Sequence, residues 1–227
     1  MKLIQKTKHI WYTDYEAERD RPSLGYIYTP KLCIAIDAGH SKEHVDEFYQ
    51  LLQEHHLPLP DMTIITHWHW DHTFAMHAVH GITISEARTE AHLQDIISKW
   101  TEHSETEFKD NNIHIRKEYE HQSMTVKGSN FIFYNKMAIH SEELTIQAFN
   151  IVSPHTDDST VVLVPEEKIL FLGDCICGNP PDWIADADKR NLQIEAFKQV
   201  DFDFAIGGHW PVFSKEELLQ ALLRNEV

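Results

Sequence analysis

The sequence predicts a mixed α/β (α+β) fold, because two hydrophobic patterns alternate along its 227 residues. Short β-branched runs that end in turn residues predict buried strands, and stretches with an apolar residue every three or four positions predict amphipathic helices. The apolar fraction of 42 % provides side chains for a core, and 8 Gly and 9 Pro are too few for a collagen-like or linker chain. We therefore expect a globular protein.

Strands are expected at the most apolar runs of the chain. Two of these runs flank the turn Thr29-Pro30-Lys31, which favours a hairpin. Another pair is separated by the turn Pro165-Glu166-Glu167-Lys168. In chain order, the expected strands are 24–28, 32–36, 62–65, 82–84, 144–152, 160–164, 169–172 and 202–206.

Helices are expected where end signals accompany a helical apolar period. Ser41 is a suitable N-cap for a helix that ends before Leu57-Pro58. Ser214 and Glu217 form a capping-box pair at the start of the last helix. Two further helices are expected at 90–100 and 188–199.

The charge balance restricts the partners that we expect. Twenty basic and thirty-six acidic residues give a net charge of −16, which repels nucleic-acid backbones and anionic lipid surfaces. We therefore expect a small-molecule substrate, with neither nucleic acid nor a membrane as partner, and the oligomeric state stays open. The first twenty residues lack the apolar segment of a signal peptide, and three cysteines cannot form a disulfide framework. A cytoplasmic location is expected.

The segment His67-Trp68-His69-Trp70-Asp71-His72 is the strongest candidate for a functional site. Imidazole and carboxylate groups suit divalent metals, and a short loop brings several of them together without the entropy cost of closing a long loop. In an extended segment, His67, His69 and Asp71 would share one side, and a turn after Asp71 would let His72 face a second centre. The loop is therefore predicted to serve two metal ions.

Three further donors follow apolar runs elsewhere in the chain. His155 follows Ile151-Val152-Ser153-Pro154, Asp174 follows the run 169–173, and His209 follows Gly207-Gly208. Strand ends are where α/β proteins build their sites. The recurrence favours a common site, although spacing alone does not show that the three ends converge.

The order of these residues resembles the metallo-β-lactamase superfamily, whose hallmark is a His-x-His-x-Asp-His loop followed by a lone His, a lone Asp and a final His. Asp37 and Gly39 also resemble the early Asp-x-Gly turn of that family. The resemblance implies a four-layer αββα sandwich, in which helices flank two mixed β-sheets packed face to face. It further implies that residues 1–227 form a single domain of this kind.

The resemblance also implies a ligand set and a reaction. Two divalent ions, preferably zinc with iron or manganese as alternatives, would let a metal-bridging hydroxide attack a small ester, thioester, lactone or phosphoester. Asp71 would also help to orient the attacking oxygen, and no residue stands out as the general acid. The implied ligands are His67, His69 and His155 for the first metal, Asp71, His72 and His209 for the second, and Asp174 as the bridge.

Two other functions stay open. Persulfide dioxygenases of the same superfamily use one iron at positions equivalent to His67, His155 and Asp174, which would make the chain an oxidoreductase. A non-catalytic metal-binding protein is the second alternative. Redox-active diiron relatives carry Glu at the position of His69, so the histidine here disfavours that branch.

Several features near the motif have competing interpretations. Many members of the superfamily have glycines where this chain has 73–76, which implies a different pocket shape. Trp68, Trp70 and Trp210 either form the walls of an apolar pocket or pack in the core. The polar stretch 101–130 is either a mobile flap or a helical insert.

Other potential ligands are assigned structural roles. The i,i+3 spacing of His77 and His80 predicts solvated positions on a helix after the loop. Cys175 and Cys177 are expected to be buried thiols beside the site, and contact of one of them with metal or with Asp174 is the lesser alternative. The remaining histidines with no partner pattern are His55, His56, His92, His103, His114, His121 and His140.

Overall fold

The computed structural model describes residues 1–227 and contains two mixed β-sheets. In the first, seven strands lie in the order β1 to β7, and β4, β5, β6 and β7 run parallel to one another. Its strands are β1 (Leu3–Gln5), β2 (Ile10–Thr13), β3 (Gly25–Tyr28), β4 (Cys33–Ile36), β5 (Met62–Ile64), β6 (Ile82–Glu86) and β7 (Phe131–Phe133).

The second sheet has six strands in the order β13-β12-β11-β10-β9-β8. Only β11 and β12 pair in parallel within it, and the other neighbours are antiparallel. Its strands are β8 (Lys136–Ser141), β9 (Leu144–Asn150), β10 (Thr160–Val164), β11 (Ile169–Gly173), β12 (Phe204–Gly207) and β13 (Phe213–Ser214).

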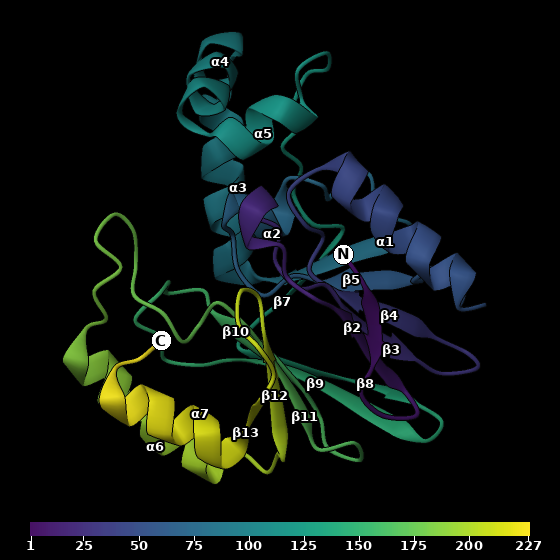
Figure 1. Cartoon of the computed structure of the whole chain (residues 1–227), viewed down its shortest axis with the longest axis vertical. Coiled ribbons are helices and arrows are strands. Elements are labelled where there is room, and N and C mark those ends of the chain that lie inside the picture. The colour runs from purple at the N-terminus through teal and green to yellow at the C-terminus, as the bar shows by residue number, and fades with distance from the viewer.

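The two sheets pack face to face, with helices outside them (Figure 1). Helix α1 lies against the outer face of the first sheet, and α6 and α7 lie against the outer face of the second. The helices are η1 (Ala17–Arg19), α1 (Lys42–Glu54), α2 (Trp70–Thr73), α3 (Ala87–Lys99), α4 (Glu102–Asn111), α5 (Ile113–Glu118), α6 (Ala187–Gln199) and α7 (Lys215–Arg224). The four-layer αββα sandwich expected from the sequence is confirmed.

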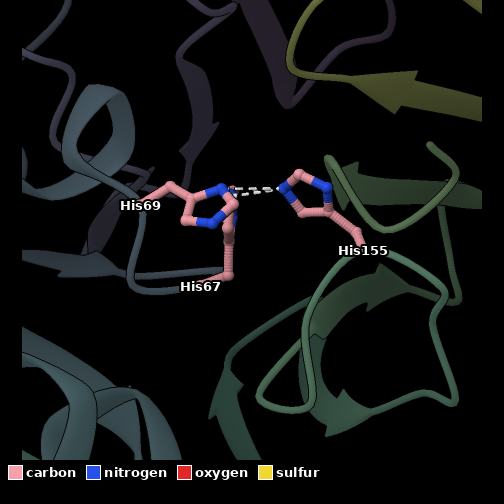
Figure 2. A group of neighbouring side chains, drawn as sticks. All are labelled: His67, His69 and His155. Atoms are coloured by element: carbon pink, nitrogen blue, oxygen red, sulfur yellow. Dashed lines mark hydrogen bonds between the residues drawn. The ribbon is translucent and has the colours of Figure 1, made fainter. Parts of the chain in front are cut away.

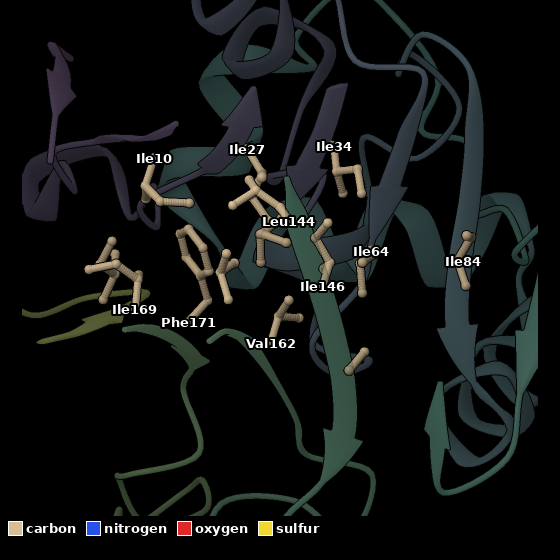
Figure 3. Close-up of a cluster of buried hydrophobic side chains, with 14 of the residues drawn as sticks. Ile10, Ile27, Ile34, Ile64, Ile84, Leu144, Ile146, Val162, Ile169 and Phe171 are labelled. Carbon is tan, nitrogen blue, oxygen red and sulfur yellow. The ribbon is translucent and has the colours of Figure 1, made fainter. Parts of the chain in front are cut away.

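The largest buried cluster fills the space between the sheets (Figure 3). Ile27, Ile34 and Ile64 come from the first sheet, and they share the cluster with Val162 and Phe171 from the second. Burying such side chains contributes about 1.5–3 kcal/mol each, so this interface holds the two halves of the chain together. The strand ends are thereby fixed relative to one another.

Four segments that carry candidate ligands leave this sandwich at strand ends. The loop after β5 contains His67, the loop after β9 contains His155, Asp174 directly follows β11, and His209 follows β12. Parallel pairing of β11 and β12 places the last two side by side. The fold thus brings together donors that lie far apart in the sequence.

The structure also differs from the expectations. The stretch 101–130 contains the helices α4 and α5, which supports the helical insert rather than a flap; both project at the top of Figure 1. Helix α2 ends at Thr73, and His77 and His80 lie outside any helix. The prediction that a helix carries these two histidines is therefore wrong. Strands β1, β2, β7, β8 and β13 were not expected, because their runs are short or polar and become strands only through pairing with another strand.

The helix ends follow the expected chemistry more closely. Ser41 accepts a hydrogen bond from the backbone N–H of His44 at the start of α1. Ser214 and Glu217 form the reciprocal capping box of α7. No helix of the structure combines the length and the apolar character needed to cross a lipid bilayer.

Candidate metal centre

The loop after β5 is held in place by two buried carboxylates of other segments. Asp37 accepts hydrogen bonds from the backbone N–H and the hydroxyl of Thr66, at 2.7 and 2.8 Å. Asp158 accepts one from the backbone N–H of Trp68 at 2.9 Å. The backbone of the loop is therefore fixed before any metal binds.

His67, His69 and His155 form the first group of candidate ligands (Figure 2). The Nε2 atom of His155 lies 3.3 Å from Nε2 of His67 and 2.9 Å from Nδ1 of His69. The two rings of the loop face the ring of His155, which comes from the second sheet's side of the fold. Three imidazole nitrogens thus converge on one point.

Asp71, His72, Asp174 and His209 form the second group. Nε2 of His209 lies 2.9 Å from Oδ2 of Asp71 and 3.5 Å from Oδ2 of Asp174. Nε2 of His72 lies 3.4 Å from Oδ2 of Asp71 and from Oδ1 of Asp174. Two imidazoles and two carboxylates therefore meet in a single buried cluster.

The two groups adjoin one another. Donor atoms of His155 and Asp174 lie within 4.8 Å of each other, together with the thiol of Cys177. The ring centroids of His67 and His72 are 4.2 Å apart. Asp174 therefore lies between the groups, as the bridging role requires.

Hydrogen bonds on the far side of the rings orient their metal-facing nitrogens. Nδ1 of His155 donates to the carbonyl of Gly178 at 2.8 Å, and Nδ1 of His72 donates to Oδ2 of Asp37 at 2.7 Å. A proton on Nδ1 leaves the lone pair of a neutral imidazole on Nε2, which faces the site. Asp37 thus fixes the loop and one of the candidate ligands.

The first group favours neutral imidazoles. Burial lowers the pKa of His67 well below its usual value, and the neighbouring imidazoles lower it further. Burial and then the ring of His155 lower the pKa of His69 to about 4. Neutral imidazole is the form that binds metal, so these side chains need not lose a proton at neutral pH.

The second group favours charged side chains. Burial lowers the pKa of His72, but the carboxylates of Asp71 and Asp174 outweigh it and raise the pKa well above its usual value. Burial likewise opposes a rise at His209, yet these two carboxylates raise its pKa to about 9. Burial tends to raise the pKa of both carboxyl groups, and the two imidazoles lower it overall. In the metal-free protein, His72 and His209 therefore carry protons that a bound cation would displace.

The donor set fits a pair of divalent cations. Nε2 of His72 and Oδ1 of Asp174 are buried without a hydrogen-bond partner, and such atoms are costly unless something else satisfies them. Imidazole and carboxylate are ligands for zinc and related ions. A Cβ atom on Gly208 would collide with Asp174 and His72, so glycine at this position lets the two ligands approach.

A cleft of about 580 Å³ opens onto both groups. The sequence left open whether Trp68, Trp70 and Trp210 form the walls of a pocket or pack in the core. All three line this cleft. Trp70 and Trp210 also pack against buried hydrophobic clusters. The remaining lining residues are Asp20, His69, Asp71, Asn112, Asp174, Cys177, Pro180, Trp183 and His209.

The structure brings all seven sequence-predicted ligands together, and that they bind metal stays a prediction. The argument from an extended loop is wrong for Asp71, because the chain becomes helical at Trp70 and turns Asp71 toward His72. His92 has a partner after all, since its Nε2 lies 2.8 Å from Oδ1 of Asp157. Cys175 and Cys177 are buried, as expected.

Sequence reasoning missed three polar or aromatic residues of the cleft. Asp20, Asn112 and Trp183 lie in segments with no recognisable motif, and they reach the cleft only through the tertiary fold. Asp20 lines the cleft together with Asp71 and Asp174, and burial and then the charge of Asp71 raise the pKa of its carboxyl group. The one sequence feature that could have drawn attention to any of the missed residues is the position of Trp183 directly after Pro180-Pro181-Asp182.

The fold has close counterparts among solved structures. A metallo-β-lactamase from Pontibacter korlensis matches with a TM-score of 0.71 and 18 % identity over 98 % of each chain. The chain has the metallo-β-lactamase fold. The DIM-1 metallo-β-lactamase, from a crystal exposed to ceftazidime, matches with a TM-score of 0.65 and 16 % identity, over 100 % of this chain and 97 % of that one. No model of a protein family matches the sequence.

The metallo-β-lactamase fold does not by itself select a substrate. A variant of the sec-alkyl sulfatase PisA1 matches with a TM-score of 0.67 and 13 % identity, over 98 % of this chain and 40 % of that one. Proteins named for different activities thus share this architecture, and the function has to be argued from the site.

Proposed function

We propose that this protein is a dinuclear metal-dependent hydrolase of a small ester, thioester, lactone or phosphoester. The observation that carries the proposal is the adjacency of two donor groups, which meet at His155 and Asp174 and both contribute residues to the lining of one cleft. The fold supports it, because the similar structures include proteins named as metallo-β-lactamases. The two groups are His67, His69 and His155, and Asp71, His72 and His209 with Asp174 shared between them.

When bound, two divalent cations would supply Lewis acidity that polarises the oxygen of a carbonyl or phosphoryl group. Zinc suits the donor set best, and iron and manganese accept the same ligands. The chain's own residues then account for the remaining requirements of a hydrolysis.

The protein side chains would hold and orient the reactants. Asp71 lines the cleft, and its Oδ2 atom is already directed by His209 at 2.9 Å. We assign to Asp71 the orientation of the attacking water. The water oxygen bonds to the acyl carbon or phosphorus, the bond to the leaving oxygen or sulfur breaks, and the leaving group departs with a proton from water.

Metal titration of chelator-treated protein tests the proposal. Hydrolysis of at least one class in a panel of esters, thioesters, lactones and phosphodiesters should appear as zinc is added and should reach its maximum near two zinc ions per chain. A coloured protein that holds one iron and consumes oxygen with thiol substrates would instead make it an oxidoreductase. Absence of turnover across the whole panel in zinc-replete protein would leave only metal binding.

A further inference from the structure

The cleft above the candidate metal centre has an unusual lining. Four of its twelve lining residues are tryptophans, and a fifth apolar residue is Pro180. No lysine or arginine is among the twelve, whereas Asp20 adds a carboxylate beside those of the ligands. Large aromatic surfaces favour flat apolar groups, and outside the metal centre and its candidate ligand His209 the lining offers no cationic side chain to pair with an anion.

Trp183 is the most exposed of the four tryptophans. Its side chain remains 57 % exposed at the cleft, although a tryptophan gains considerably from burial. Its ring lies nearly parallel to that of His155, at an interplanar angle of 18° and a centroid distance of 6.1 Å. An exposed aromatic face thus lies next to the predicted first metal site.

The backbone holds Trp183 in this position at a cost. Its φ of +57° is in the left-handed region, which is unfavourable for a bulky side chain. A Cβ on Gly178 would collide with the Trp183 carbonyl, so glycine permits the segment to close on itself. The Gly178 carbonyl in turn accepts the Nδ1–H of His155. Backbone strain retained at an exposed aromatic residue favours a role in ligand contact.

The arginines on either side of Asp20 do not supply the missing positive charge. Arg19 bonds Glu43 at 2.7 Å and Glu47 at 3.0 Å. Arg21 is fully buried and bonds Glu47 and Glu118 at 2.9 and 3.0 Å. Both guanidinium groups are thus occupied by carboxylates, and Asp20 keeps its negative charge uncompensated by them.

We infer that the cleft selects carboxylic esters, thioesters or lactones that carry an aromatic or similarly flat apolar group and no anionic group. This inference rests on the proposed hydrolase and narrows its substrate class, because it removes phosphodiesters and carboxylated or sulfonated compounds. Trp183 contacts the apolar group, and Asp20 rejects anions.

Ligand binding tests the inference independently of turnover. The probes are 2-naphthamide, which is neutral, and 2-naphthalenesulfonate, which has the same ring and a negative charge. Quenching of tryptophan fluorescence should show that the amide binds about tenfold more tightly or better, in both zinc-loaded and chelator-treated protein. Equal or tighter binding of the sulfonate would overturn the inference.

Two variants assign the effect to residues. Trp183→Ala should weaken naphthamide binding about tenfold, and Trp183→Phe should keep most of it. Asp20→Asn, which tolerates the left-handed φ of +54° at this position, should strengthen sulfonate binding severalfold, whereas Asp46→Asn on α1 should not. Unchanged binding in both Trp183→Ala and Asp20→Asn would overturn the assignment.

Kinetics separate this inference from the proposed function. In zinc-loaded protein, kcat/KM for 2-naphthyl acetate should exceed that for its 6-sulfonated analogue and should fall in Trp183→Ala, whereas ethyl acetate should respond little to the substitution. Preferential naphthamide binding without hydrolysis of any ester would refute the hydrolase and leave the ligand class standing. Hydrolysis with a preference for the sulfonated ester would support the hydrolase and refute the inferred ligand class.

Discussion

The pKa values of the candidate histidine ligands shift in opposite directions in the two groups, although the rings of His67 and His72 lie only 4.2 Å apart. The first group contains imidazoles alone, and burial lowers the pKa of His67 and His69. In the second group, Asp71 and Asp174 overcome burial and raise the pKa of His72 and His209. The difference shows that carboxylates, rather than depth, decide which candidate ligands carry protons in the metal-free protein.

The largest effect is expected from Asp174, where the two groups meet. Asp174→Ala removes the shared carboxylate and leaves Nε2 of His72 with only one of its two carboxylate neighbours at 3.4 Å, that of Asp71. We expect loss of both metals and a fall in hydrolysis of more than about 100-fold, since even supporting residues of metal sites contribute 10–100-fold. Metal analysis and a rate assay on the same sample measure both quantities.

His77→Ala is the matched control for that variant. His77 follows the ligand loop, but its Nδ1–H donates to the carbonyl of Phe74 at 2.9 Å and does not face the donors. Metal content and rate should stay nearly intact. A larger loss in His77→Ala than in Asp174→Ala would mean that the ligand assignment is wrong.

A smaller but selective effect is expected at Asp37. Asparagine has nearly the same shape as aspartate and tolerates the φ of +64° at position 37. Asp37→Asn therefore replaces the charged hydrogen-bond partner of His72 Nδ1 with a neutral amide. The second metal should bind about 10–100-fold more weakly, and the first should bind as before. Stepwise zinc titration by calorimetry resolves the two events. Equal weakening of both would show that Asp37 supports the loop as a whole instead of one ligand.

The pH dependence of the metal-free protein tests the contrast itself. The lowered pKa of His69, about 4, makes stability rise with pH between about 4 and 6.5, because the unfolded chain binds that proton and the folded chain does not. The raised pKa of His209, about 9, makes its contribution complete below pH 6.5 and lost as pH rises through 9. Stability without metal should therefore peak near pH 6.5.

Thermal unfolding in the presence of a chelator measures that profile. His69→Ala should flatten its acid limb and His209→Ala its alkaline limb, because each variant removes one titrating group. Metal-loaded protein should lack the alkaline fall, since His209 would already be deprotonated. If His69→Ala and His209→Ala both leave the dependence of stability on pH unchanged, the two groups do not differ in protonation as described.

The smallest effect is expected far from the centre, at the cap of α7. Ser214→Ala removes the hydroxyl that accepts the Glu217 backbone N–H at 3.2 Å. It should lower the free energy of unfolding by about 1 kcal/mol and Tm by about 2–4 °C. Metal content and rate should not change, and a loss of either would show that α7 influences the site.

Local chemistry made parts of this structure predictable. The capping residues Ser41 and Ser214 and the runs that became β4, β5, β10 and β11 could be identified because their signals lie within a few residues. The seven donors could be named because their order resembles a known pattern. Their convergence is a property of sheet packing, to which residues such as Ile64 and Phe171 contribute from opposite sheets.

The remaining features depend on contacts between distant segments. Strand β7 becomes a strand through pairing with the distant β6, and helices α4 and α5 form in a stretch with weak apolar periodicity. The extended-loop argument put Asp71 on the side of His67 and His69, whereas a helical turn begins at Trp70 and groups Asp71 with His72. Asp20 and Trp183 reach the cleft from segments whose local sequence gives no indication of one another.

Elemental analysis of gently purified protein tests the central claim most directly, because that claim is the presence of two adjoining metal sites joined at Asp174. We predict close to two divalent ions per chain in the native protein and none retained in Asp174→Ala. One ion per chain in the native protein, with the same ion retained in Asp174→Ala, would contradict the account.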